Sequence, residues 1–329
     1  MASDESDWEG VRLHVVTGKG GTGKTTVAAA LALALSGQGR RTLLIEVEAR
    51  QGIAQLFDVP PLPYEERKVA AGPGGGDVFA LAVDAEAALL EYLDMFYKLG
   101  RAGRGLRRIG AIDFATTIAP GMRDVLLTGK LYEAVRRKRN GRPVYDAVVL
   151  DAPPSGRITR FLGVNQEVAG LAKVGPVRGQ ADSIMGLLTS PQTAVHLVTL
   201  LEEMPVQETC DAIEQLTEAG LPVGGIVINA VRAPLLKHAD LTAAAKGRLD
   251  PAVVRGGLQA AGVAVKDSVV EALIDEARDH AVRVALEKSG RRTLKSLDRP
   301  TYELPLLAEG VDLGGLYALA ERLCQQGAA

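Results

Sequence analysis

Short runs of apolar, often β-branched residues recur along the chain and alternate with longer stretches of helical spacing. Runs such as AVVL and GIVI are apolar throughout, which is typical of strands that helices cover on both faces. The alternation predicts an α/β fold with a doubly wound, mostly parallel sheet. The predicted strands are 13–17, 42–47, 78–83, 144–150, 194–200, 223–229 and a short last strand at 302–306.

Two helical regions, 85–140 and 163–190, interrupt this alternation. We expect them to pack together as a helical subdomain above the sheet, inserted into a single domain that spans 1–329. A further helical region at 231–299 contains the stretch DSVVEALIDEARDHAVRVALEK, whose apolar residues recur at helical spacing. That spacing predicts an amphipathic helix packed on the core.

Composition narrows the class of protein. The chain has 329 residues, 47% of them hydrophobic, and a formal net charge of −2, so we expect a large core and no nucleic-acid partner. Its start is acidic and polar, unlike a secretory signal. The apolar run VAAALALAL is far shorter than the roughly 20 residues that cross a bilayer. We expect a cytoplasmic protein whose association with a membrane, if it has one, is peripheral or through a partner.

A glycine-rich loop, TGKGGTGKTT, separates the first predicted strand from a long alanine and leucine segment. Its glycines allow positive φ angles that turn several N–H groups towards one point, where the next helix also presents its positive end. Polyphosphate binds at such a point, with Lys24 pairing the β/γ-phosphates and the Thr25 hydroxyl ligating Mg²⁺. The predicted cofactors are ATP and Mg²⁺, and the predicted nucleotide-binding residues here are Gly18, Lys19, Gly20, Gly21, Thr22, Gly23, Lys24, Thr25 and Thr26.

A second lysine, Lys19, directly follows the first glycine. A lysine at this point suits a nucleotide held across a dimer interface, where it adds positive charge to the leaving phosphate oxygens. The loop resembles the deviant Walker A motif of the superfamily of Min-system and chromosome-partitioning ATPases, nitrogenase iron protein, and arsenite-pump and guided-entry ATPases. The resemblance implies a nucleotide-sandwich dimer in which Lys19 acts on the partner's site. The alternative is a solvated loop lysine.

The segment YDAVVLDAPPSGRITRFL places Asp151 at the carboxyl end of a buried strand, where doubly wound sheets bind ligands. An acid there can hold the magnesium shell, so the predicted metal residues are Thr25 and Asp151. The segment resembles D-T-A-P-T-G-H-T-L-R of the arsenite-pump and guided-entry branch. LPLLAEGVDLGGL, with Pro305, resembles the adenine loop of that branch. Asn229 ends a strand as its adenine-contacting asparagine does, or closes the strand through an Asx-turn.

The stretch LLIEVEARQGIAQLF aligns with the switch segment of the same branch, S-T-D-P-A-H-N-L-S-D. The aspartate that orients the attacking water falls at Glu48, whose extra methylene moves its oxygens by roughly 1 Å, and such a misplacement can cost on the order of 100-fold in rate. We expect slow intrinsic hydrolysis unless backbone shifts restore the geometry. The predicted catalytic residues are Lys19, Lys24, Glu48 and Asp151.

Other motifs of the superfamily are missing. Cys210 and Cys324 match neither the zinc-clamping C-x-x-C of guided-entry ATPases nor an arsenite-binding cluster, so we expect no zinc or arsenite site. The chain most resembles actinobacterial members of the branch, described as anion-transporting ATPases. In guided-entry ATPases, dimer closure forms an apolar groove for a hydrophobic helix. Here the groove would be lined by Met95, Phe96, Met122 and Met185, or these residues form the subdomain core.

The resemblance implies a Mg²⁺-dependent ATPase that couples closure of a dimer to capture or release of a protein client, such as a hydrophobic helix or a membrane-associated partner. The dimer is either a homodimer or a heterodimer with a paralogous ATPase whose intact aspartate segment supplies the faster site. Two alternatives remain. One is a weakly hydrolysing regulatory subunit of a hetero-oligomeric ATPase, and the other is a partitioning-type ATP switch that binds a surface.

Overall fold

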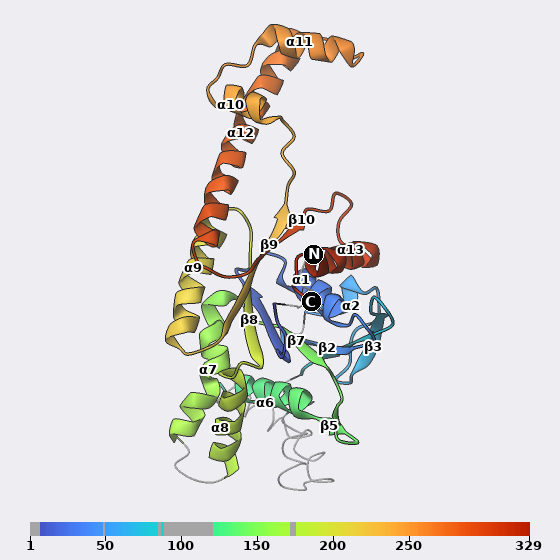
Figure 1. Ribbon diagram of the computed structural model, residues 1–329, viewed down its shortest axis with the longest axis vertical. Helices are drawn as coiled ribbons and strands as arrows, with labels where there is room; N and C mark the ends of the chain where they lie inside the picture. The colour runs from blue at the N-terminus through green and yellow to red at the C-terminus, as the bar shows by residue number, and fades with distance from the viewer. Residues whose placement is uncertain (1–6, 49, 85–86, 89–120, 172–175) are drawn as a thin grey trace, which may run out of the picture.

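The computed structural model describes residues 7–48, 50–84, 87–88, 121–171 and 176–329. Their centre is an eight-stranded sheet in the order β10-β9-β8-β1-β7-β2-β4-β3 (Figure 1). Its strand pairs are parallel except for β3 with β4. The strands are β1 (Leu13–Gly18), β2 (Arg41–Glu46), β3 (Arg67–Ala71), β4 (Asp77–Ala82), β7 (Ala147–Asp151), β8 (Thr193–Thr199), β9 (Val223–Val231) and β10 (Thr301–Pro305).

All seven strands expected from the apolar runs are present, and the doubly wound, mostly parallel fold class is confirmed. Strand β3 was not predicted. It pairs antiparallel with β4 at the edge of the sheet, and its residues are only partly buried, so no apolar run marks it. Strands β5 (Lys138–Arg139) and β6 (Arg142–Pro143) form a hairpin that was not predicted either. Both strands are exposed and contain no run of apolar residues.

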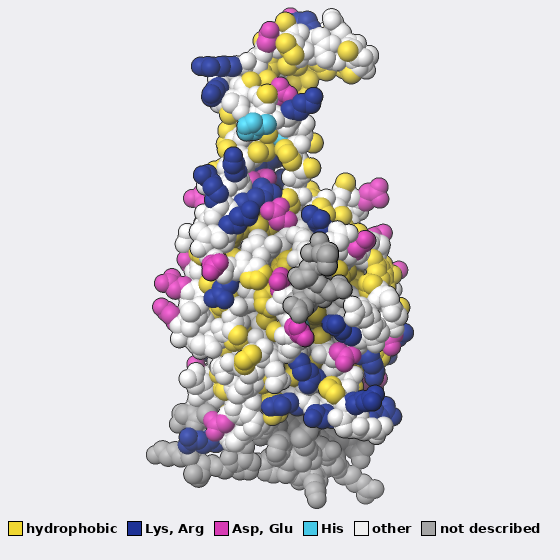
Figure 2. All heavy atoms as spheres, viewed as in Figure 1, with side chains coloured by type: hydrophobic (Ala, Val, Ile, Leu, Met, Phe, Trp, Pro, Cys, Tyr) yellow, Lys and Arg dark blue, Asp and Glu magenta, His cyan; other side chains and the backbone are white. Residues whose placement is uncertain are grey.

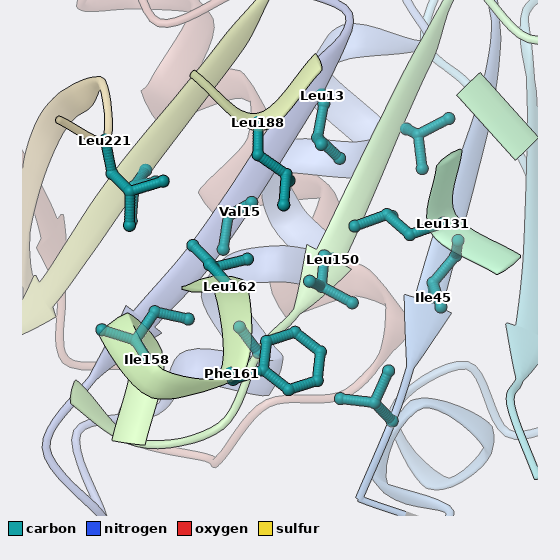
Figure 3. Close-up of a cluster of buried hydrophobic side chains, with 14 of the residues drawn as sticks. Leu13, Val15, Ile45, Leu131, Leu150, Ile158, Phe161, Leu162, Leu188 and Leu221 are labelled. Carbon is teal, nitrogen blue, oxygen red and sulfur yellow. The ribbon is translucent and has the colours of Figure 1, made fainter. Parts of the chain in front are cut away.

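Helices cover both faces of the sheet. One face packs against α1 (Lys24–Leu35), α2 (Gly52–Leu56) and α13 (Leu313–Gln325). The other packs against α6 (Met122–Arg136), α7 (Ser155–Leu171), α8 (Pro176–Leu188) and α9 (Glu203–Glu218). Side chains from β1, β2 and β7 meet those of α7 in this second layer, as Leu150 and Phe161 do in Figure 3. Alternate strand residues therefore serve two separate cores.

The predicted helical insert is described only in part, because 89–120 lies outside the described residues. Helices α6, α7 and α8 contact one another, as expected of a unit. They also rest directly on the sheet, since α6 contributes Leu126, Leu127 and Leu131 to the same core as β1 and β7. Substitutions on α6 therefore test its role more cleanly than a deletion would. The extent of the insert as a subdomain stays a prediction.

The region 231–299 forms an arm. Its helices are α10 (His238–Ala245), α11 (Pro251–Ala260) and the long α12 (Asp267–Lys295), which extends away from the sheet with α10 and α11 at its far end (Figure 1). Only Val270, His280, Ala281 and Leu294 of α12 are buried. The prediction of a helix packed on the core is wrong for most of α12, because its far part packs on α10 and α11 instead.

Apolar side chains remain exposed along this arm. Leu286 of α12 is 62% exposed and Val253 of α11 is 71% exposed. Figure 2 shows hydrophobic side chains over the far end of the arm. Among the described residues, no helix is both long and apolar enough to cross a membrane.

Candidate functional site

The glycine loop joins β1 to α1 at the carboxyl edge of the sheet. Gly18 and Gly23 have φ angles of +151° and +86°. A Cβ at Gly18 would collide with the carbonyl oxygen of Val198, and one at Gly23 would collide with the side-chain amide of Asn229. Both positions therefore require glycine, for backbone conformation as well as for space.

The first turn of α1 is open to an anion. Its N-cap is Gly23, no side chain caps the helix, and no acidic residue lies in the first turn. The amide groups there remain without side-chain acceptors, which is the usual condition of a phosphate site. The Lys24 ammonium crosses the loop and donates to the Lys19 carbonyl at 3.3 Å. Burial lowers the pKa of Lys24, while Asp151 and Glu48 raise it and Arg50 lowers it.

The predicted metal residues are in contact. The Thr25 hydroxyl donates to Asp151 Oδ2 at 2.7 Å. Burial raises the pKa of Asp151 to about 6, against the hydrogen bond from Thr25 and the charge of Lys24, while Glu46 and Glu48 raise it further. A hydroxyl and carboxylates are the oxygen donors that Mg²⁺ prefers, so the donor set fits that cation.

These residues do not form a metal cage by themselves. Across the described ranges, no three His, Cys, Asp or Glu side chains gather closely enough to hold a metal ion. Mg²⁺ commonly binds through one or two carboxylates together with substrate phosphates and waters. The arrangement therefore fits a cation that arrives with a nucleotide.

Glu48, the predicted switch carboxylate, borders a small cavity. The cavity has a volume of about 100 Å³ and is lined in part by Glu48, Arg50, Arg123, Asp124 and Arg157. Glu48 Oε2 lies 3.5 Å from Arg50 Nη2, and the Glu48 side chain is 24% exposed. A polar cavity of this size can hold several water molecules. Glu48 is thus placed where water can reach it.

Lys19 is directed away from the loop. Its ammonium forms an ion pair with Glu208 of α9 at 2.7 Å, and the two side chains are 30% and 37% exposed. Ion pairs this exposed typically contribute less than about 1 kcal/mol. Lys19 is therefore held by α9 of its own chain, but only weakly.

Asn229 ties the end of β9 to the loop. Its side-chain amide donates to the Thr22 carbonyl at 2.9 Å. Pro305 ends β10 and is exposed, and the next amide, that of Leu306, donates to the Val231 carbonyl of β9. The structure thus brings Lys24, Thr25, Glu48, Asp151 and Asn229 to one region, while Lys19 faces α9 and Pro305 stays at the sheet edge.

Three residues at or beside the site were not predicted from the sequence: Glu46, Arg123 and Glu208. Glu46 is a buried acid that ends β2, and the run LLIE carries the same signal, an acid after an apolar strand, that identified Asp151. Glu208 holds Lys19, and Arg123 of α6 donates to the Val47 carbonyl at 3.1 Å. Only helix packing determines the last two contacts, so no local pattern could have indicated them.

The chain is similar to known ATPases over the region that carries this site. Residues 11–190 match a family model described as Anion-transporting ATPase. The chain is 58% identical over 319 residues to ATPase BagA of Mycobacterium tuberculosis, which covers 97% of this chain and 94% of that protein. It is 27% identical over 253 residues to an arsenical pump-driving ATPase of Acidiphilium multivorum, covering 70% of this chain and 41% of that protein.

Replacing Asp151 with asparagine should stabilise the nucleotide-free protein. The pKa of Asp151 is about 6 in the folded protein, above the ordinary value of 3.8. The protonated side chain therefore favours the folded state fully below pH 3.8, and this contribution to the free energy of unfolding is lost as pH rises through 6. At about 1.4 kcal/mol per pKa unit, the ionised carboxylate costs about 3 kcal/mol at pH 8. Urea unfolding at pH 8 should show Asp151→Asn more stable by that amount, and the gap should close near pH 4.

The matched control is Asp275→Asn, which replaces an exposed aspartate in the middle of α12, away from the ends of the helix. It should leave the free energy of unfolding unchanged at both pH values. Equal stability of Asp151→Asn and the wild-type protein at pH 8 would show that burial of Asp151 carries no cost.

Proposed function

The chain belongs to the anion-transporting ATPase family, as its loop and Asp151 segments indicated, and we propose that it is a dimeric, Mg²⁺-dependent ATPase. ATP-driven closure of the dimer would be coupled to capture or release of a protein client. One observation carries the proposal: the phosphate-type loop, the Thr25–Asp151 contact and the switch carboxylate Glu48 share one edge of the sheet.

Each residue has a role that its position supports. The loop amides and Lys24 bind the phosphates, and Thr25 and Asp151 hold the cation. When bound, Mg²⁺ supplies positive charge that offsets the charge of the phosphates. Glu48, beside its cavity, orients the attacking water. Asn229, which is tied to the loop, and the segment after Pro305, which is tied to the end of β9, would contact the base.

Lys19 would complete the site of the partner subunit. Its ammonium is directed at α9 and not at its own Lys24. Because the ion pair with Glu208 is partly exposed and weak, Lys19 can leave it when a partner presents a nucleotide. There its charge would stabilise the leaving phosphate oxygens.

Client coupling is supported by a contact between α6 and the switch segment. Arg123 donates to the carbonyl of Val47, which directly precedes Glu48. Movement of α6 would therefore shift the switch. Of the proposed groove residues, Met95 and Phe96 lie outside the described residues, and the side chain of Met122 is not described either. Met185 packs against the sheet core, so it favours the alternative of subdomain core at that position.

The two lysines should fail in different ways. Lys24→Ala should abolish ATP binding, because the phosphates lose the counter-charge inside the loop. Lys19→Ala should bind ATP with unchanged affinity but hydrolyse it about 10³-fold more slowly, as expected of a cation supplied in trans. A fluorescent ATP analogue measures binding, and phosphate release measures turnover. Lys246→Ala, an exposed arm lysine, is the control. Equal loss of binding in both loop variants would remove the cross-dimer role.

Coupling to a client should depend on Arg123. The probe is a labelled synthetic hydrophobic helix of about 20 residues. The wild-type protein should bind it several-fold more tightly with ATP than without nucleotide, whereas Arg123→Ala should bind it equally in both conditions. Arg136→Ala, on the same helix but stacked over Tyr132, should behave as the wild-type protein. A nucleotide-dependent affinity that survives in Arg123→Ala would place the coupling elsewhere.

A second candidate is a weakly hydrolysing half of a heterodimer, and the observation that favours it is the glutamate at position 48, drawn towards Arg50. If carboxylate placement limits the rate, Glu48→Asp should raise steady-state phosphate release by about 10-fold or more. Adding a paralogue with an intact aspartate should raise turnover above the sum of the two proteins. Brisk turnover by the isolated protein that Glu48→Asp reduces would contradict this candidate.

A further inference from the structure

A buried carboxylate beside the site has one oxygen without a partner. Glu46, the last residue of β2, is 2% exposed. Its Oε1 accepts a hydrogen bond from the Gly52 amide at 3.2 Å. Its Oε2 is buried and has no hydrogen-bond partner among the described residues. Such an oxygen destabilises the fold, so its presence calls for a bound group that satisfies it.

The register of the sheet sets Glu46 beside Asp151. Strands β2 and β7 pair in parallel, with Glu46 opposite Asp151. Two residues earlier on each strand, Leu44 and Val149 lie in the core that includes α1. Because side chains alternate along a strand, Glu46 and Asp151 face that same side. Their carboxylates therefore lie next to each other under the start of α1.

The start of α2 closes this cluster. Gly52 packs against Thr25 so closely that a Cβ there would lie 3.3 Å from Thr25 Cγ2. Thr25 in turn donates to Asp151. The cluster of Thr25, Glu46, Gly52 and Asp151 thus joins the first turn of α1, two strands and the segment that follows Glu48.

The geometry points to Glu46 as an outer ligand of the cation site, accepting a hydrogen bond through Oε2 from a water bound to Mg²⁺. The inference rests on the proposed function, because it requires a cation at Thr25 and Asp151. An outer position accords with the way Mg²⁺ binds in proteins, where it retains several of its waters.

Glu46 would also link the cation to the switch. One carboxylate oxygen holds the first amide of α2, and the other holds a water of the cation. Binding of the cation therefore fixes the end of the segment that carries Glu48. Glu46 is in this sense a positioning residue, which acts through the water shell and the Gly52 amide.

The test measures how Mg²⁺ changes nucleotide affinity. The full-length protein is titrated with Mg²⁺ in the presence of a fluorescent ADP analogue, and a parallel measurement in EDTA gives the affinity without the cation. Glu46→Gln keeps the size of the side chain and an acceptor for Gly52 but loses the charge. It should raise the Mg²⁺ midpoint 10- to 100-fold, as loss of outer ligands commonly does, and leave the affinity in EDTA unchanged.

The matched control is Thr42→Val on the same strand, which removes another buried oxygen that has no partner. It should not move the Mg²⁺ midpoint. An unchanged midpoint in Glu46→Gln, or an equal loss of affinity with and without Mg²⁺, would overturn the inference and leave Glu46 as a support for Gly52 alone. If the wild-type protein bound no nucleotide, the proposed function itself would fall.

Discussion

The hydrogen bond from Thr25 to Asp151 is the contact on which the arrangement of the site depends. It joins the first turn of α1 to the carboxyl end of β7, and so brings the phosphate-type loop to the neighbouring strand. The bond forms in a buried place, which raises the pKa of Asp151 and makes the ionised carboxylate costly. A bound cation would offset the unfavourable charge of this buried carboxylate. A raised pKa of this kind, caused by burial, is typical of groups in functional sites.

The elements around this bond come from both layers of the fold. From the α1 side, Gly52 packs against Thr25 and its amide is held by Glu46. From the other side, α6 reaches the carbonyl of Val47 through Arg123. The segment between β2 and α2 is thus held at its beginning by one layer and at its end by the other. In the proposed function this segment carries the carboxylate that orients water, and its two attachments would let it respond both to the nucleotide and to α6.

The arm at 231–299 differs from the rest of the fold because little of it is buried against the sheet. Over most of its length, α12 packs against α10 and α11 and not against the sheet. Large apolar side chains such as Leu286 remain exposed. The family match covers 11–190, whereas the similarity to ATPase BagA covers 97% of the chain. The arm at 231–299 therefore lies outside the residues that the family model matches. Its existence could be predicted as helical, but its separation from the core could not.

The sequence alone determined the parallel strands, the glycine loop and the acid at Asp151. These features are local: an apolar run, a loop spacing and a polar residue directly after a strand each carry their physical reason within a few neighbouring residues. The tertiary structure decided the rest. Edge strand β3 has no apolar run, because water reaches it. Lys19 meets Glu208, and Arg123 meets Val47, only because helices pack across long stretches of chain. Glu46 had the same local signal as Asp151, but its place beside that carboxylate follows from strand register, which pairs residues that no local pattern relates.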